Sequence, residues 1–354
     1  MKSTIVTRIG KIRLGAALLA ALAPGLFAGT VAAAEVNLYS YRQPFLIEPI
    51  LAKFTEETGI EVNVVFANKG MIDKIKAAGE NNPADAVLTV DIGRLDGLVR
   101  AELLEPVESQ VLDANIPASL RHPDGLWFGL TTRARVVYAH TSRVGADEVL
   151  TTADLADPKL KGRICSRSGK HGYNVAYIAA VIARDGEAAA EEWLKGVKAN
   201  LARKPQGNDR AQAKAIYEGV CDVALANTYY VGKMATNEKK PEQQDWARAI
   251  RVQFLDQDGP GQHVNISGAA VIKGAKNRED AIRLIEFLAE DVAQGMYASS
   301  NFEYPVKAGV ATDPLIESLG EFRTDPLPLS EIARHRKAAS LLVDRVGFEE
   351  GPAT

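Results

Sequence analysis

Two adjacent tyrosines, Tyr229 and Tyr230, are the residues of this chain best suited to chemistry. They follow an apolar run that reads as a strand and ends at Asn227 and Thr228, and they begin a helical pattern. At a junction between a strand and a helix both phenols can point into one cleft, whereas neighbours along a strand point to opposite faces. Phenolate oxygens are hard donors, so the pair favours capture of a hard metal ion.

The first 34 residues have the pattern of a cleaved secretory signal peptide. Four basic residues precede an apolar stretch rich in Ala, Leu and Gly that starts at Leu14, and three alanines precede Glu35. An uncleaved anchor is the alternative, but Pro24 and the many small residues make a poor spanning helix. We therefore expect an exported protein of the periplasm.

Charge and length limit the class of protein. The chain of 354 residues has a net charge of −3, and its signal segment carries only cations, so the mature chain is more acidic still. A mildly acidic chain argues against nucleic-acid binding. The length fits two domains, and the absence of a repeat or a long linker suggests that the chain crosses between them more than once. We expect a monomer.

The first part of the mature chain alternates between strand and helix patterns, as parallel α/β units do. We expect strands at 36–40, 61–66 and 86–90, and helices at 45–58, 71–78 and 94–100. These elements predict a doubly wound domain whose ligand crevice lies at the carboxyl ends of its strands, near residues 40–43 and 89–93.

The second part continues the α/β pattern from a candidate crossing strand at 133–140. Further strands are expected at 163–166, 223–227 and 266–272, and helices at 173–183, 188–201, 209–219, 230–236 and 278–298. The long last helix could return to the first domain. Two α/β lobes joined by crossing strands make a hinged clamshell, and such interfaces commonly hold ligands.

The two cysteines occupy matching positions. Cys165 comes eight residues before Tyr173, and Cys221 comes eight residues before Tyr229, each in or just ahead of a predicted strand. Equal spacing would place the cysteines side by side if those strands are parallel neighbours. An exported protein favours a disulfide between them, although two buried thiols are the alternative.

A set of short motifs, in this order along nearly the whole mature chain, resembles the ferric-ion-binding periplasmic proteins of ABC importers. The motifs are Tyr39-Ser40-Tyr41-Arg42-Gln43, the segment 129–135, Cys165-Ser166-Arg167-Ser168-Gly169 leading to Tyr173-Asn174, Gly207-Asn208-Asp209, Asn227-Thr228-Tyr229-Tyr230, and Glu303-Tyr304-Pro305-Val306. The resemblance implies an α/β, two-lobed type II periplasmic binding protein fold with crossing hinge strands. We expect an N-terminal lobe at 35–132 and 260–302, and a C-terminal lobe at 133–259 and 303–354.

The same resemblance implies that Tyr173, Tyr229 and Tyr230 are the metal ligands, as in the group of that family that holds iron with three tyrosines and a carbonate-type anion. Ferric iron is a small, hard ion that prefers oxygen donors and can displace phenol protons. Three tyrosinates would cancel its three charges.

Residues for the accompanying anion, carbonate or bicarbonate, are also implied: Arg133, Ser168, Gly169, Asn208 and Asn227. Backbone N–H groups at Ser168 and Gly169 could cradle an oxyanion, and Arg133 offers a bidentate guanidinium. The alternatives are a helix cap for Asn208 and a surface or hinge ion pair for Arg133.

The first lobe departs from the family pattern. Gln43 stands where several relatives have a His, and Val90 stands where some have a Glu. Neither is a good ferric ligand, so we expect this lobe to supply closure and hydrogen bonds, with Gln43 and Arg42 as possible contacts of the anion.

We therefore expect a periplasmic solute-binding protein that captures ferric iron with a synergistic anion and delivers it to an ABC permease. It is not expected to be an enzyme. One alternative is a binder of an organic cation or a free oxyanion in the same fold. A remoter one is an exported metal-dependent hydrolase that uses His171 as its acid or base.

Overall fold

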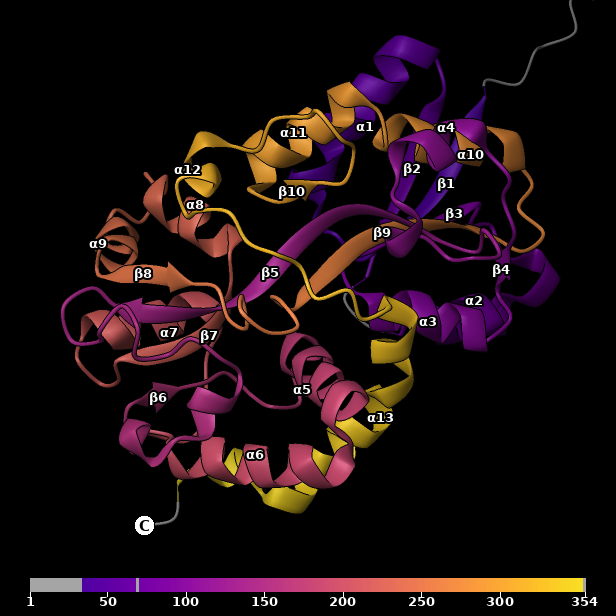
Figure 1. The fold of residues 1–354 in the computed structure, drawn as a ribbon. Helices are drawn as coiled ribbons and strands as arrows, with labels where there is room; N and C mark the ends of the chain where they lie inside the picture. Colours follow the sequence, from indigo (N-terminus) through magenta and orange to yellow (C-terminus); the bar gives the residue numbers. More distant parts are fainter. Residues whose placement is uncertain (1–33, 68–69, 353–354) are drawn as a thin grey trace, which may run out of the picture. The chain divides into compact units, whose positions relative to one another are not determined.

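The computed structural model describes residues 34–67 and 70–352, and all that follows concerns these residues. The predicted signal peptide therefore lies outside the described residues except for Ala34. Within the described part, strands and helices form two groups, each built around its own set of paired strands (Figure 1). The long strand β5 (Phe128–His140) belongs to both sets.

The first sheet has the strand order β2-β1-β3-β9-β5. Its strands are β1 (Glu35–Ser40), β2 (Glu61–Phe66), β3 (Ala86–Thr89), β4 (Leu104–Glu105), β9 (Val264–Ile272), β10 (Tyr304–Pro305) and the first half of β5. β1 is parallel to β2 and β3, whereas β9 is antiparallel to both β3 and β5. The sequence predicts the three parallel strands to within one residue at each end.

Helices cover both faces of this first sheet: α1 (Pro44–Thr58), α2 (Met71–Ala78), α3 (Ile92–Arg100), α4 (Gln110–Asn115), α10 (Arg278–Leu288) and α11 (Asp291–Asn301). Alternate residues of β1 supply the two cores, because side chains on a strand point to opposite faces. Leu38 belongs to the core that includes α1 and α10, and Tyr39 belongs to the core that includes α2 and α3. Figure 1 shows these helices on opposite sides of the strands.

The second sheet is built on the second half of β5. Its other strands are β6 (Ile164–Cys165), β7 (Val223–Asn227) and β8 (Ile250–Gln253). Its helices are α5 (Gly172–Asp185), α6 (Glu187–Ala199), α7 (Asp209–Tyr217), α8 (Tyr229–Ala235), α9 (Glu242–Arg248), α12 (Pro314–Glu317) and α13 (Leu329–Val346). β7 and β8 run antiparallel to β5, and β6 is parallel to β7.

β5 and β9 are the crossing strands. β5 pairs with β9 as far as Ala134 and with β7 from Arg135 onward, so one continuous strand enters both sheets. It begins at Phe128, earlier than the predicted start at Arg133. The predicted α/β fold with crossing strands is confirmed, while the lobe boundaries given above stay a prediction.

The predicted helix at 278–298 is wrong, because two helices, α10 and α11, occupy this segment. Glu290 between them is extended, with φ −93° and ψ 167°. The side-chain amide of Gln294 donates to the carbonyls of Leu288 and Leu130, both at 2.8 Å. A continuous helix would need the Leu288 carbonyl for its own ladder, so this buried amide stabilises the break.

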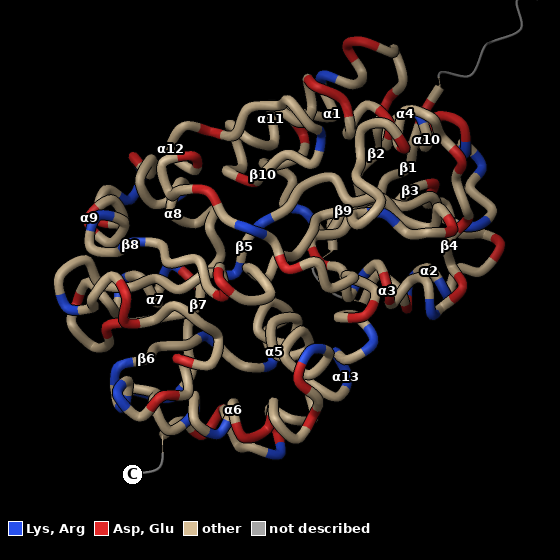
Figure 2. The backbone as a smooth tube through the Cα atoms, in the orientation of Figure 1, with Lys and Arg blue, Asp and Glu red and all other residues tan. Residues whose placement is uncertain are grey.

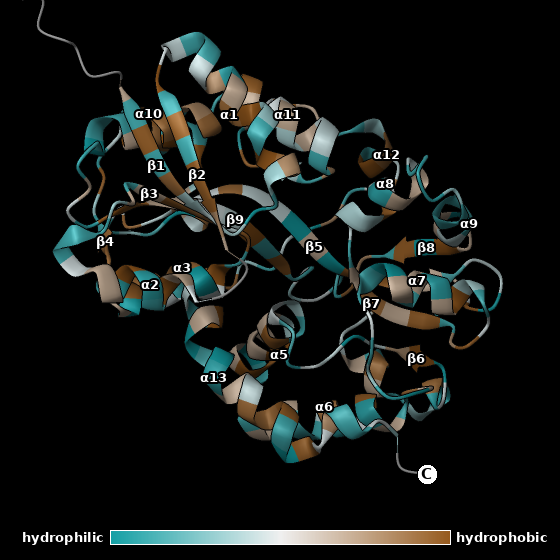
Figure 3. Ribbon diagram, turned by 180° about the vertical axis from the view of Figure 1, so that it is seen from behind, coloured by the Kyte–Doolittle hydropathy of each residue, from teal (hydrophilic) through white to brown (hydrophobic). Residues whose placement is uncertain are grey.

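Apolar residues gather on the strands and on the helix faces turned toward them, as the brown colouring of Figure 3 shows. Hydrophilic residues colour the outer helix faces in the same view, which is the pattern of amphipathic helices around a buried sheet. Among the helices of the described residues, none combines the length and the apolar character needed to cross a bilayer.

The predicted disulfide between Cys165 and Cys221 is confirmed. β6 and β7 are parallel neighbours, as the matched spacing requires, and the Cα atoms of the two cysteines lie 5.8 Å apart. Cys165 lies at the end of β6 and Cys221 just before β7. The bridge therefore ties together the two strands that lead toward Tyr173 and Tyr229.

Replacing both cysteines by alanine should lower the free energy of unfolding by about 2–5 kcal/mol, because the bridge closes a long loop of the unfolded chain. The cysteines are 56 residues apart in sequence. Urea denaturation of the variant and of the wild type, each with and without reductant, measures the difference. Identical midpoints for variant and oxidised wild type would contradict the expectation.

Candidate metal centre

A cavity of about 510 Å³ opens where the two sheets meet. The first-sheet wall carries Tyr41, Arg42 and Gln43 after β1, and Val90 after β3. The second-sheet wall carries residues from the starts of α5, α7 and α8. The cavity is lined by Tyr41, Arg42, Gln43, Phe45, Leu46, Phe66, Val90, Arg94, Arg133, Tyr173, Arg210, Tyr229, Tyr230, Lys233, Asn301 and Glu303. It lies at the carboxyl ends of β1, β3 and β7, as the sequence predicts.

The structure brings the three predicted tyrosines together. The phenol oxygens of Tyr173 and Tyr229 are 3.1 Å apart, and the rings of Tyr229 and Tyr230 have centroids 4.3 Å apart. All three side chains line the cavity. Three oxygens converging from two helices can surround one cation.

Two of these phenols are buried enough for their acidity to change. Burial, with Tyr173 and Tyr230 nearby, raises the pKa of Tyr229 well above its usual range. Burial and the same neighbour Tyr173 raise the pKa of Tyr230 to about 12. Both phenols therefore keep their protons at neutral pH until a strong positive charge enters the cavity and favours the phenolates.

The local fold explains why Tyr229 and Tyr230 face one cavity. The carbonyl of Asn227, the last residue of β7, accepts a hydrogen bond of 2.7 Å from the Tyr138 hydroxyl. The Thr228 amide donates to the Ala134 carbonyl at 3.1 Å. These bonds fix the end of β7 against β5, and α8 begins at the next residue.

Tyr173 is held by a polar turn at the start of α5. His171 is the N-cap residue, and its Nδ1 accepts from the Tyr173 amide at 3.2 Å. The Asn174 amide donates to the carbonyls of Arg167 and Ser168, both at 3.1 Å. These hydrogen bonds hold the loop against the first turn of α5, and they therefore fix the backbone position of Tyr173.

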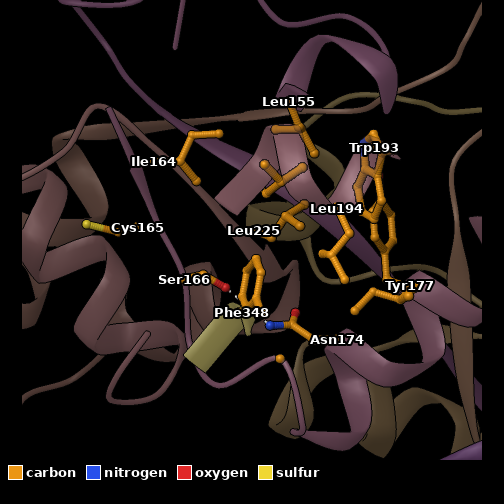
Figure 4. Close-up of a pocket in the computed structure, with 13 residues that line it drawn as sticks. Leu155, Ile164, Cys165, Ser166, Asn174, Tyr177, Trp193, Leu194, Leu225 and Phe348 are labelled. Carbon is orange, nitrogen blue, oxygen red and sulfur yellow. Dashed lines mark hydrogen bonds between the residues drawn. The ribbon is translucent and has the colours of Figure 1, made fainter. Parts of the chain in front are cut away.

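An apolar pocket behind this loop supports it (Figure 4). Figure 4 shows Phe348, Tyr177 and Leu194 turned toward one another, with a hydrogen bond between Ser166 and Asn174 at the edge. The free space is about 20 Å³, scarcely more than one water needs. The pocket is therefore packed core that fixes the position of the Tyr173 loop.

A buried ion cluster lies behind the tyrosines. Asp209 has no exposed surface, and its two carboxylate oxygens accept from Arg135 and Arg167, each at 2.8 Å. The guanidinium carbons of Arg135 and Arg167 lie 5.8 and 5.2 Å from the centroid of the Tyr173 ring. The cluster carries one net positive charge beside the ring of Tyr173, a predicted ligand.

Asp209 is the first residue of α7, where an acidic side chain commonly faces solvent, but here it is fully buried. Burial alone would raise the pKa of its carboxyl, but Arg135 and Arg167 outweigh burial and the pKa is lowered. The Asn227 amide also donates to it, at 3.0 Å. This carboxylate is a buried counter-ion that joins α7 to β5 and β7.

Among the predicted anion residues, Arg133 lies at the cavity. It is 2% exposed, and its guanidinium donates to the Ser267 hydroxyl at 3.0 Å and to the Val90 carbonyl. Both of these partners are neutral. Within residues 34–67 and 70–352, no carboxylate forms an ion pair with Arg133, so the alternative of a surface or hinge ion pair is not seen there.

The other four predicted anion residues do not line the cavity. Ser168 and Gly169 donate to one oxygen of Glu349, at 3.1 and 2.6 Å, so a carboxylate of the chain already occupies that cradle. Asn208 caps α7 by accepting from the Ala211 amide at 3.1 Å, which is its alternative role. Asn227 accepts from Arg135 at 2.9 Å.

The first-lobe residues Arg42 and Gln43 both reach the cavity. Arg42 is 3% exposed and donates to Ser267 at 2.6 Å and to Glu303 at 2.8 Å. Glu303 also accepts from Thr131 at 2.9 Å, so it is a buried carboxylate with two partners. Burial would raise its pKa, yet Arg42 and Arg133 lower it.

Sequence reasoning gave no site role to several polar residues of the cavity wall: Arg94, Arg210, Lys233, Asn301 and Glu303. The Arg210 guanidinium lies 5.5 Å from the Tyr230 ring centroid. Burial lowers the pKa of Lys233 to about 8. Lys233 follows the tyrosine pair by one helical turn, so helical spacing was the signal that could have found it. Figure 2 shows Lys and Arg colouring parts of β5 in the middle of the molecule.

His171, the acid or base of the hydrolase alternative, serves as a helix cap. Burial and the nearby Arg167 and Arg135 lower its pKa to about 4, so it is neutral at physiological pH. No group of three or more His, Cys, Asp or Glu side chains placed to hold a metal occurs in the described part of the chain.

A contact outside the cavity joins its two walls. Arg336 on α13 pairs with Asp91, the N-cap of α3, at 3.2 Å and donates to the carbonyl of Gly172 at 3.2 Å. Asp91 follows Val90 of the first wall, and Gly172 precedes Tyr173 of the second. The side chain of Arg336 passes over Gly93, where a Cβ atom would overlap it.

Comparison with known proteins agrees with this fold. The model of the bacterial extracellular solute-binding protein family matches residues 50–324. "Iron uptake protein A1" of Synechocystis sp. is 42% identical over 316 residues, covering 89% of this chain and 88% of that protein. The Mannheimia haemolytica "Ferric iron-Binding Protein A in an open conformation" has a TM-score of 0.83 and 48% identity, covering 90% of this chain and 99% of that one.

A Trichodesmium protein solved "in complex with iron and citrate ligands" has a TM-score of 0.85 and 41% identity, covering 89% of this chain and 99% of that one. The chain therefore belongs to the bacterial extracellular solute-binding proteins. Its relatives within this class are iron uptake and ferric iron-binding proteins, which confirms the resemblance found in the sequence. They are binding proteins, which confirms that the chain is not an enzyme.

Proposed function

We propose that this chain is a periplasmic ferric-iron-binding protein that delivers iron to an ABC permease of the inner membrane. The observation that carries the proposal is the meeting of three phenols in one cavity, with the Tyr173 and Tyr229 oxygens 3.1 Å apart. The names of the relatives, "Iron uptake protein A1" and "Ferric iron-Binding Protein A", support the same cargo.

Tyr173, Tyr229 and Tyr230 are the proposed ligands. Ferric iron is a hard cation whose charge is large enough to displace phenol protons even where burial has raised the pKa. Three phenolates balance the charge of the ion, so the bound site is neutral before any anion is counted. Because protons compete with iron for the same oxygens, affinity should fall in mild acid.

An oxygen-donor anion completes the proposed site. Carbonate or bicarbonate is the proposed anion, and the citrate of the Trichodesmium complex supports a larger carboxylate as an alternative. The cavity wall carries five basic side chains: Arg42, Arg94, Arg133, Arg210 and Lys233. Glu303 is the acidic side chain among the lining residues, so the wall as a whole favours an anion.

Movement of the two walls is the proposed signal to the permease. β5 and β9 pass between the sheets, and a bend in such strands closes a cavity without breaking either core. The Mannheimia neighbour is named as an open conformation, which supports a fold that has open and closed states. Iron would then change the surface that the permease meets.

A visible absorption titration tests the proposal. The purified mature chain is mixed with ferric nitrilotriacetate, with and without bicarbonate. We expect a broad tyrosinate-to-iron charge-transfer band, strongest with bicarbonate, that fades as the pH is lowered. A chain that stays colourless and retains no iron after gel filtration would overturn the proposal, and the basic lining would then favour a free oxyanion as the solute.

A further inference from the structure

Asn301 is a buried cavity residue with an unusual feature. It is the last residue of α11, it is 1% exposed, and it lines the cavity. Neither its Oδ1 nor its Nδ2 has a hydrogen-bond partner in the described residues. Buried amides are nearly always paired, because an unpaired polar group loses the free energy of its bonds to water. Such a side chain at a cavity wall calls for a partner in the cavity.

Lys233 also lines the cavity, and it contacts the residue next to Asn301. Its ammonium is 5.9 Å from the centroid of the Phe302 ring, and Gly232 packs so closely on that ring that a Cβ atom would lie 2.4 Å from it. This packing brings α8 against the residue next to Asn301. In the described part of the chain, no carboxylate lies within ion-pair distance of Lys233. Glu303 is nearby, but its carboxylate accepts hydrogen bonds from Arg42 and Thr131.

The backbone between these groups is strained. Phe302 has φ 60° and ψ 30°, a left-handed conformation that is rare for a large side chain. Such conformations cluster at binding sites, where the surrounding structure enforces them. Here the turn sends Asn301 and Glu303 to the same cavity, one without partners and the other paired with Arg42.

We propose that Lys233 and Asn301 form a subsite for the oxyanion that accompanies ferric iron, and that this oxyanion carries an O–H group. The inference rests on the proposed function and assigns residues to its anion. The Lys233 ammonium and the Asn301 Nδ2 donate to the anionic oxygens, while the Asn301 Oδ1 accepts from the O–H. Bicarbonate and α-hydroxycarboxylates have both features, whereas a plain carboxylate leaves Oδ1 unpaired.

Two matched pairs of anions test this complementarity. Glycolate and acetate differ by one hydroxyl, as do bicarbonate and formate. The apparent affinity for ferric iron is measured in each anion by competition with nitrilotriacetate. We expect the wild type to bind ferric iron more tightly with the hydroxyl-bearing member of at least one pair. The pair that shows this preference tells whether the anion is bicarbonate or an α-hydroxycarboxylate.

Asn301→Ala should remove that preference, because it removes the Oδ1 that accepts from the O–H. Lys233→Met should instead lower the apparent affinity for iron about 10- to 100-fold in both members of each pair, the effect of losing a hydrogen bond to a charged group. Both variants should still show the tyrosinate band, because no phenol is changed. Lys239→Met, which removes an exposed lysine of the same region, is the matched control and should keep both the preference and the affinity of the wild type. Lys233→Arg, which retains the charge, should keep part of the affinity that Lys233→Met loses.

Folding is measured separately. Asn301→Ala removes two unpaired polar atoms, so we expect the iron-free variant to unfold at a urea concentration no lower than the wild type. Wild-type preference in Asn301→Ala, or wild-type affinity in Lys233→Met, would overturn the subsite, and equal affinity of the wild type in both members of each anion pair would overturn the role of the O–H. A wild type that binds no iron in any anion would instead remove the proposed function, and the subsite with it.

Discussion

Replacing Tyr229 and Tyr230 together by phenylalanine should abolish ferric iron binding. Both phenol oxygens lie in the cavity with Tyr173, and phenylalanine keeps the ring packing while removing the donor atoms. Changes outside the metal's ligand set usually lower affinity by roughly 10- to 100-fold, so loss of two ligands should exceed that. Equilibrium dialysis with ferric nitrilotriacetate measures the affinity, and the charge-transfer band should disappear with it.

Tyr217→Phe is the matched control, because Tyr217 is 50% exposed at the end of α7 and lies outside the cavity. It should bind iron as the wild type does. Tyr173→Phe alone should weaken binding and shift the band, since one phenolate is lost and two remain. Unchanged iron affinity in the double variant would contradict the three-tyrosine site.

Replacing Asp209 by alanine should lower the free energy of unfolding by about 3–5 kcal/mol, the usual result of leaving a buried charge without its partner. Arg135 and Arg167 would both lose their counter-ion in a region where Asp209 has no exposed surface. Urea denaturation measures the loss. Asp245→Ala, which breaks an exposed pair with Arg248, is the control and should change stability by less than about 1 kcal/mol.

The carboxylate of Asp209 also makes the stability of the folded protein depend on pH. Because the folded pKa of Asp209 is lowered, its contribution to stability is present above the unfolded value of about 3.9 and is lost as pH falls through the folded value. The wild type should therefore lose stability below about pH 4, and the alanine variant should lose less over that range. If the free energy of unfolding falls with pH by the same amount in the wild type and in Asp209→Ala, this role of Asp209 is contradicted.

The sequence predicts well what depends on local pattern. The parallel strands of the first sheet follow from apolar runs bounded by turn residues. The disulfide between Cys165 and Cys221, expected for an exported protein if their strands are parallel neighbours, is present. The meeting of Tyr173 with Tyr229 and Tyr230 follows from the resemblance, and the geometry of the cavity agrees.

The parts that sequence reasoning missed depend on partners far away in the chain. A loop at Ser168 and Gly169 looks like an anion cradle, but only the fold shows that Glu349 fills it. Asp209 reads as a helix start, and its two arginines come from β5 and from the loop after β6. The break between α10 and α11 depends on Gln294 reaching Leu130, a contact that no local pattern encodes.

The link made by Arg336 has a consequence for the order of folding. Its partner Gly172 is 164 residues away, and its other partner Asp91 is farther still along the chain. Contacts of such long sequence separation form late, because closing the loop between them costs entropy before anything is gained. β9 pairs with β3 across a comparable separation, so completion of the first sheet and the link between the cavity walls both belong to the late steps of folding, after the local helices have formed.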